Sequence, residues 1–106
     1  MEAKKLIHSA VMKSADKHGV KVVEIILFGS RARDDFRADS DWDVLIVTAR
    51  PLNWEKRLSF TGEIRKTLAK KGLATDILVI SKDELEKVEG AKGYIYHYAL
   101  REGVKI

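Results

Sequence analysis

Three short apolar segments rich in β-branched residues alternate with amphipathic stretches, and this alternation is the strongest restriction on the fold. Residues 21–28, 41–48 and 74–80 have the length and composition of buried strands. Apolar residues recur at helical spacing over residues 4–18 and again after Asn53. Because a helix joins the second and third strands, we expect these strands to be parallel with a right-handed crossover.

Turn and capping signals predict the remaining elements. Residues 30–35 predict a short helix or turn, Ser81 and Glu84 form a capping box that opens another short helix, and residues 94–102 predict a last helix. In the helix after the second strand, one apolar stripe is expected to face the core. Its members are Trp54, Leu58, Thr61, Ile64 and Leu68. The sequence therefore predicts an α/β chain of the α+β kind, with a small mixed sheet covered by helices in a single domain over residues 1–106.

The composition favours a soluble protein of the cytoplasm. The net charge is +4, from 20 basic and 16 acidic residues, and the two signs are interspersed, so we expect no direct binding of nucleic acid. The chain has no cysteine, which excludes disulfides and thiolate chemistry. No apolar run is long enough to span a bilayer, and the N-terminus lacks the apolar stretch of a signal peptide, so no membrane partner is expected.

Asp41 and Asp43 stand at positions i and i+2 where the second strand begins. Side chains alternate along a strand, so both carboxylates point to one face, with Cα atoms roughly 6.6 Å apart. Two carboxylates at this spacing can share Mg²⁺ ions, whose other ligands are usually waters and phosphates. Taken alone, such a pair is more often two exposed acids at a strand end.

Gly29 and Ser30 follow the first strand and open a helical turn. Glycine lets a phosphate approach the backbone closely, free N–H groups at a helix start attract anions, and the Ser30 hydroxyl is a further donor. Arg31 and Arg33 could bind phosphate oxygens through their planar guanidinium groups. The alternative is that both arginines are surface residues or partners of the nearby acids Asp34, Asp35 and Asp39.

Attack of a hydroxyl on an α-phosphate needs a third carboxylate, as a metal ligand, a proton acceptor or both. Asp76 is the candidate because it interrupts the otherwise apolar third strand. An acid there is costly unless it is paired or metal-bound, although at a strand end it could simply meet solvent. To bring these groups together, the first strand must contribute its C-terminal end and the second its N-terminal end. These two strands should therefore be antiparallel neighbours.

The spacing of these residues resembles a known superfamily. Residues 29–43 satisfy the pattern Gly-Ser-x(10)-Asp-x-Asp in full, which is the signature of the DNA polymerase β-like nucleotidyltransferases. The longer string, Gly-Ser-Arg-Ala-Arg followed by Ser-Asp-x-Asp, is similar to the minimal nucleotidyltransferases, often called MNT antitoxins. The resemblance extends over essentially the whole chain, including Asp76 and the ending at residues 99–104. The combined motif is highly specific.

By this resemblance, Gly29 and Ser30 would hold the triphosphate of ATP, and Asp41 and Asp43 would bind two Mg²⁺ ions, which Mn²⁺ could replace. Asp76 would complete the metal site and help to deprotonate the acceptor hydroxyl. The metal ions would neutralise charge on the α-phosphate and the departing pyrophosphate. One residue departs from the family pattern: Asp34 stands where glycine is common, and it should repel the triphosphate unless it points outward.

Three functions remain open from the sequence. The resemblance implies an adenylyltransferase that modifies a HEPN-domain toxin, a ribonuclease, on a tyrosine. The alternatives are an enzyme that acts on a small molecule and a non-catalytic antitoxin that acts by binding. The short chain favours a protein acceptor with its own docking surface, and the complete set of carboxylates favours an enzyme. Tyr94, Tyr98 and Arg101 share one face of the last helix and could contact the partner, although such a stripe is more often packing.

Overall fold

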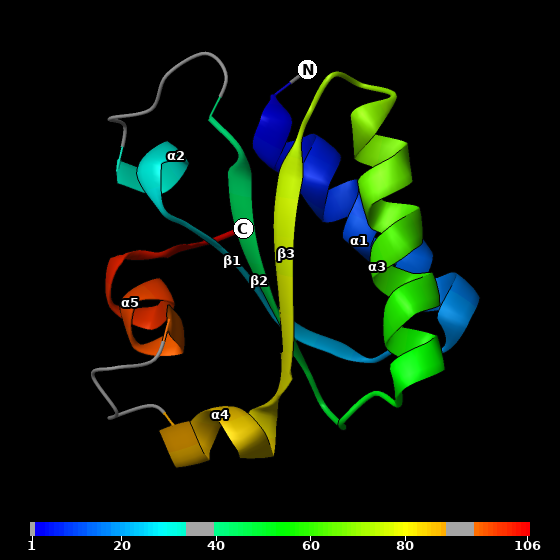
Figure 1. Ribbon diagram of the computed structural model, residues 1–106, viewed down its shortest axis with the longest axis vertical. Coiled ribbons are helices and arrows are strands. Elements are labelled where there is room, and N and C mark those ends of the chain that lie inside the picture. The colour runs from blue at the N-terminus through cyan, green and yellow to red at the C-terminus, as the bar shows by residue number, and fades with distance from the viewer. Residues whose placement is uncertain (1, 34–39, 89–94) are drawn as a thin grey trace.

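A mixed four-stranded sheet with helices on both faces organises the chain (Figure 1). The computed structural model describes residues 2–33, 40–88 and 95–106. In chain order the elements are α1 (Ala3–His18), β1 (Val22–Phe28), α2 (Ser30–Arg33), β2 (Trp42–Thr48), α3 (Trp54–Ala69), β3 (Thr75–Ser81), α4 (Lys82–Val88), α5 (Ile95–Glu102) and β4 (Val104–Lys105). The expected α/β class and the order of the expected elements are confirmed.

The strand order is β3-β2-β1-β4. β2 and β3 are parallel, and β1 and β2 are antiparallel, as the sequence predicts. β4 is an addition, because the sequence gives no strand after the last helix. It consists of two residues, which pair with Ile26 and Leu27 of β1, and a segment this short carries no periodicity that could reveal it.

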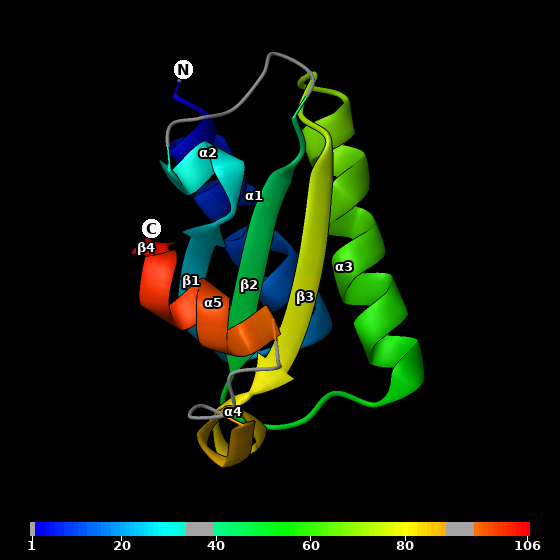
Figure 2. The same cartoon turned by 60° about the vertical axis from the view of Figure 1, so that its left-hand side comes forward.

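The sheet is covered on both faces, which explains why its strands are continuous apolar runs. Alternate residues of β1 point to opposite faces: Ile25 and Leu27 pack with α1 and α3, whereas Ile26 and Phe28 pack with α4 and α5. Figure 2 shows α3 on one side of β3 and α5 on the other. In the part of the chain that the structure describes, no helix is both long and apolar enough to cross a membrane.

The expected inner stripe of α3 is wrong at its N-terminal end. Trp54 is 72% exposed and Leu58 is 50% exposed, whereas Thr61, Ile64 and Leu68 are buried as predicted. The helix instead buries Phe60, whose side chain is fully inaccessible. The face that meets the core is therefore rotated relative to the expected stripe, and Trp54 and Leu58 lie on the flank of the helix.

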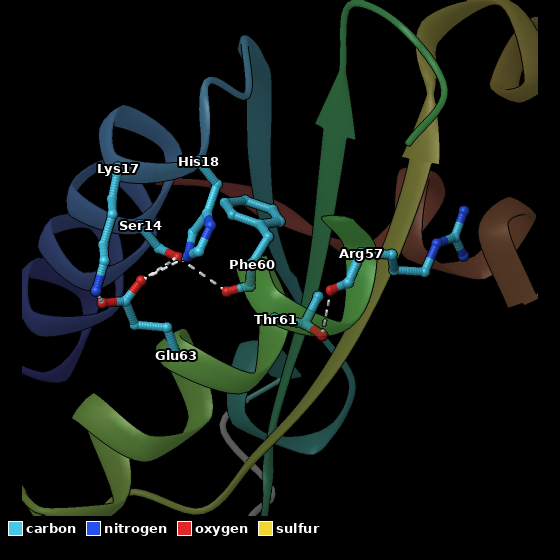
Figure 3. A network of polar contacts seen from close by, with 7 residues as sticks. All are labelled: Ser14, Lys17, His18, Arg57, Phe60, Thr61 and Glu63. Atoms are coloured by element: carbon cyan, nitrogen blue, oxygen red, sulfur yellow. Dashed lines mark hydrogen bonds and ion pairs between the residues drawn. The ribbon is translucent and has the colours of Figure 1, made fainter. Parts of the chain in front are cut away.

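A polar network joins α1 to α3 (Figure 3). The buried Ser14 hydroxyl donates to the Phe60 carbonyl at 2.9 Å and lies 3.2 Å from Glu63 Oε2. Lys17 Nζ donates to Glu63 Oε1 at 3.0 Å, and His18 Nε2 lies 2.8 Å from Glu63 Oε2. These contacts fix the two helices against each other at the edge of the apolar core.

The network predicts a loss of stability in acid. The hydrogen bond from Lys17, followed by that from His18, holds the pKa of Glu63 below its ordinary value of 4.5. Because the folded pKa is depressed, this stabilisation is fully present above pH 4.5 and is lost as the pH falls through the folded value. We expect Glu63→Gln to lower Tm at pH 7 and the difference from wild type to shrink in acid. Thermal unfolding across pH checks this, with the exposed Glu86→Gln as control; a deficit that persists unchanged in acid would contradict it.

Candidate functional site

The register of the sheet brings the predicted site residues to one end of it. Phe28 of β1 lies opposite Asp43 of β2, and Asp43 lies beside Asp76 of β3. Gly29 and Ser30 directly follow Phe28, so the turn into α2 begins at the same end as both carboxylates. Asp41 precedes β2 by one residue and lies at this end too. Segments nearly fifty residues apart in the sequence thus meet at one sheet end because β1 is antiparallel to β2 and β2 is parallel to β3.

Gly29 is in direct contact with the Asp43 carboxylate. Its φ is +74°, a backbone conformation that residues other than glycine rarely adopt. A Cβ atom at this position would overlap Asp43 Oδ2. The Gly29 carbonyl accepts hydrogen bonds from the N–H groups of Ala32 and Arg33, both at 3.1 Å, which closes the turn. Glycine is therefore required both by the backbone and by the position of a carboxylate.

Negative charge accumulates around Asp43. Its side chain is partly buried, whereas Asp41 and Asp76 are exposed. Burial raises the pKa of Asp43 above its ordinary value, the neighbouring carboxylates of Asp76 and then Asp41 raise it further, and Arg33 acts in the opposite direction. The ionised form of Asp43 is thus less favourable than that of an ordinary aspartate, and a bound cation would offset both the burial and the repulsion.

The donors at this end of the sheet suit a hard divalent cation. They are carboxylate oxygens, the ligands that Mg²⁺ prefers. Among the described residues, no group of three or more acidic, histidine or cysteine side chains is arranged to hold a metal by itself. Mg²⁺ commonly completes its shell with water and substrate phosphates in addition to protein carboxylates. Asp41, Asp43 and Asp76 are the residues that would provide the protein's share.

Arg31 holds the segment that carries Asp41. Its Nε and Nη2 atoms donate to the Ser40 carbonyl at 3.2 and 3.0 Å, and its guanidinium carbon lies 4.5 Å from the centroid of the Trp42 ring. A guanidinium stacked on indole is a favourable cation–π contact. The residues on both sides of Asp41 are therefore fixed to α2, a positioning role that sequence reasoning did not identify.

Arg33 lies between the site and the last helix. Its Nη1 atom is 3.3 Å from Glu102 Oε2 of α5, and its charge lowers the pKa of Asp43. The two partners are 69 positions apart, so no local pattern could have revealed their contact. Asp34, where the sequence departs from the family pattern, lies outside the described residues.

The exposed face of α5 is only partly described. Tyr98 is 50% exposed and Arg101 is exposed, whereas Ala99 of the same helix is fully buried. Tyr94, the third residue of the expected stripe, lies outside the described residues. Tyr98 and Arg101 are thus surface residues, not core packing.

Comparison with known proteins agrees with this geometry. A family model described as a nucleotidyltransferase domain matches residues 9–104. A Sulfolobus solfataricus protein, provisionally identified as a nucleotidyltransferase in its crystal structure, matches with a TM-score of 0.60 and 25% identity over 95% of this chain and 76% of that one. A protein provisionally identified as a minimal nucleotidyltransferase matches with a TM-score of 0.62 and 22% identity over 100% of this chain and 97% of that one.

No curated protein matches the sequence significantly. The resemblance to the polymerase β-like nucleotidyltransferases, first indicated by residues 29–43, is confirmed by the family match over most of the chain and by the fold. The chain belongs to the nucleotidyltransferase domain family and has the fold of a minimal nucleotidyltransferase.

Proposed function

We propose that the chain is a metal-dependent adenylyltransferase that moves AMP from ATP to a hydroxyl group on a partner protein. The observation that carries this proposal is the sheet register, which places Asp43 beside Asp76 and opposite the residue that precedes Gly29. A phosphate-binding turn and a carboxylate cluster at one end of a sheet are the two parts that nucleotide transfer requires.

Each residue of the cluster has a separate task in this proposal. The Gly29–Ser30 turn binds the triphosphate through backbone N–H groups and a hydroxyl. Asp41 and Asp43 hold Mg²⁺, which supplies charge neutralisation at the α-phosphate and the leaving pyrophosphate. Asp76 accepts the proton from the attacking hydroxyl, whose oxygen forms the new bond to the α-phosphorus while the bond to pyrophosphate breaks.

The acceptor in this proposal is a tyrosine of a HEPN-type ribonuclease toxin, and the chain is its antitoxin. The resemblance to MNT antitoxins suggests this partner. The exposure of Asp41 and Asp76 supports a macromolecular acceptor, because the carboxylates lie at the surface where a hydroxyl of another protein can reach them. An adenylyl group beside a ribonuclease site would add a bulky anionic phosphodiester that repels the RNA backbone.

ATP binding should require a divalent cation. We expect calorimetry to show that ATP binds in the presence of Mg²⁺ or Mn²⁺. Asp43→Ala should weaken this affinity strongly, whereas Asp83→Ala, a control at an exposed position, should not change it. Because the pKa of Asp43 is raised, protons should compete with the cation at a higher pH than they do at an ordinary aspartate. As the pH is lowered, the affinity for ATP with the cation should therefore begin to fall at a higher pH. Undiminished affinity in EDTA would exclude the metal-bound nucleotide.

Transfer should modify the partner covalently. We expect intact-mass spectrometry of a HEPN-type partner, incubated with ATP, Mg²⁺ and this protein, to show one or more added adenylyl groups, most of them on tyrosine. The partner should remain non-toxic after this protein is removed. If no mass is added and the Asp41→Ala/Asp43→Ala double variant still neutralises the partner fully, neutralisation occurs by contact and the non-catalytic function is correct.

A further inference from the structure

β3 is an edge strand that begins at the site. It is the first strand in the order β3-β2-β1-β4, and within the described residues no strand pairs with its outer side. In Figure 1, β3 is drawn in front of the other strands, and no helix passes in front of it. Such an edge presents a row of unpaired N–H and C=O groups that can pair with another chain.

A shallow groove straddles this edge. Its volume is about 190 Å³, and it is lined from three elements. α3 contributes Arg57, Leu58, Thr61 and Arg65, β3 contributes Ile77, Leu78 and Val79, and α5 contributes Tyr96. The half-exposed Leu58 lies one helical turn after the exposed Trp54, so apolar surface continues along α3 beyond the groove.

Two arginines give the groove its charge. Arg65 Nη1 donates to Thr61 Oγ1 at 3.3 Å, and its Nη2 atom reaches the Ile77 carbonyl only at 3.5 Å. Figure 3 shows the Arg57 side chain extending past β3, away from the network that joins α1 and α3. The lining contains no acidic residue, and neither arginine forms an ion pair within the described part of the chain. The groove is therefore cationic and apolar at once.

The Arg65 contact also shows which backbone groups face outward. The Ile77 carbonyl points away from β2, and because successive residues of a strand alternate between its two edges, the N–H and C=O groups of Val79 point the same way. A long contact from the exposed Arg65 side chain covers this edge, and an incoming strand could displace it.

We propose that the free edge of β3 takes an extended segment of the protein partner as an added strand, and that this segment alternates apolar and acidic residues. Main-chain hydrogen bonds to β3 would provide affinity, and carboxylates facing Arg57 and Arg65 would provide specificity. The inference rests on the proposed function and deepens it: β3 also carries Asp76, so the end of the added strand lies beside the group that receives the acceptor's proton.

A second copy of this chain fits the edge less well. α3 joins two parallel strands and therefore runs antiparallel to β3. A two-fold pairing of β3 edges would place Arg65 of each copy toward Arg57 of the other, and like charges at close range oppose association. An acidic segment meets the same arginines favourably.

A peptide probe tests the edge without ATP or metal. The probe is an acetylated and amidated peptide as long as β3 that alternates Val and Glu. The comparison peptides carry Lys in place of Glu, or carry N-methyl groups on alternate amides so that they cannot complete a ladder. We expect the acidic probe to protect the Ile77 and Val79 amides from hydrogen–deuterium exchange and to bind about tenfold more tightly than the Lys peptide. The N-methylated probe should not bind.

Charge reversal identifies the two arginines. Arg57→Glu/Arg65→Glu should exchange the preference between the acidic and basic probes. Lys56→Glu/Lys66→Glu, an equal charge change at two exposed positions of α3 that do not line the groove, should not. The proposal is overturned if no probe protects β3, if both charges bind equally, or if an uncharged Arg57→Gln/Arg65→Gln variant self-associates through β3 while no probe binds. In that last case the arginines only guard the edge. Probe binding is independent of ATP binding, so a failure of the edge and a failure of the adenylyltransferase proposal are distinguishable.

Discussion

Asp76→Asn is expected to leave ATP binding mostly intact and to reduce the rate of transfer by about 10²–10⁴-fold, the usual contribution of a positioned base. Asparagine has nearly the same shape as aspartate but cannot accept the proton of an attacking hydroxyl. Asp43 and Asp41 keep their carboxylates in this variant, so the protein retains most of its share of the metal ligands.

The Asp76 variant should also fold normally. Asp76 is exposed, and substitutions at such positions usually change stability by less than about 0.5 kcal/mol. Single-turnover transfer to the partner, calorimetry with Mg²⁺ and ATP, and thermal unfolding therefore separate the possibilities. If the variant transfers AMP at the wild-type rate, Asp76 is only an acidic residue at a strand end. If the variant loses ATP affinity as well as transfer, Asp76 acts chiefly as a metal ligand.

The sequence predicted the sheet because its strongest signals are local. Three apolar segments predicted the strands, and a capping box at Ser81 predicted the helix after the third one. The helix between the second and third strands predicted that these two strands are parallel. The Ser81 side chain does meet Glu84, with Ser81 Oγ donating to Glu84 Oε1 at 2.8 Å and accepting from the Glu84 N–H at 3.3 Å. Requiring Gly29, Asp43 and Asp76 to meet gave the antiparallel pairing of β1 with β2, which no local signal contains.

The errors come from contacts between distant segments. Trp54 and Leu58 fit a helical stripe by spacing, but which face of α3 is buried depends on where α1 and the sheet lie. Phe60 is buried in the core cluster that it shares with residues of α1 and of the sheet. The stacking of Arg31 on Trp42 and the pairing of Arg33 with Glu102 likewise depend on tertiary structure. Arg57 and Arg65 could not be recognised as a pair beside β3 before the strand order was known.

Gly29→Ala is expected to damage stability and nucleotide binding together. The backbone at Gly29 has φ +74°, and forcing a side chain into a left-handed conformation costs roughly 1–2 kcal/mol. The new methyl group would also overlap Asp43 Oδ2, so the carboxylate would have to move away from its place beside Asp76. We therefore expect a lower free energy of unfolding and an ATP–Mg²⁺ affinity that approaches that of Asp43→Ala.

The chain provides matched controls that separate these two effects. Gly19 and Gly72 also have positive φ, +66° and +81°, but an added Cβ at either would meet no atom within 4 Å. Gly19→Ala and Gly72→Ala should therefore lower the free energy of unfolding by an amount similar to the backbone contribution in Gly29→Ala. Both variants should bind ATP with wild-type affinity. Chemical denaturation and calorimetry on all three variants measure both quantities. If Gly29→Ala binds ATP as tightly as these controls, the contact between Gly29 and Asp43 does not position the carboxylate for the metal, and the turn acts only as a bend between β1 and α2.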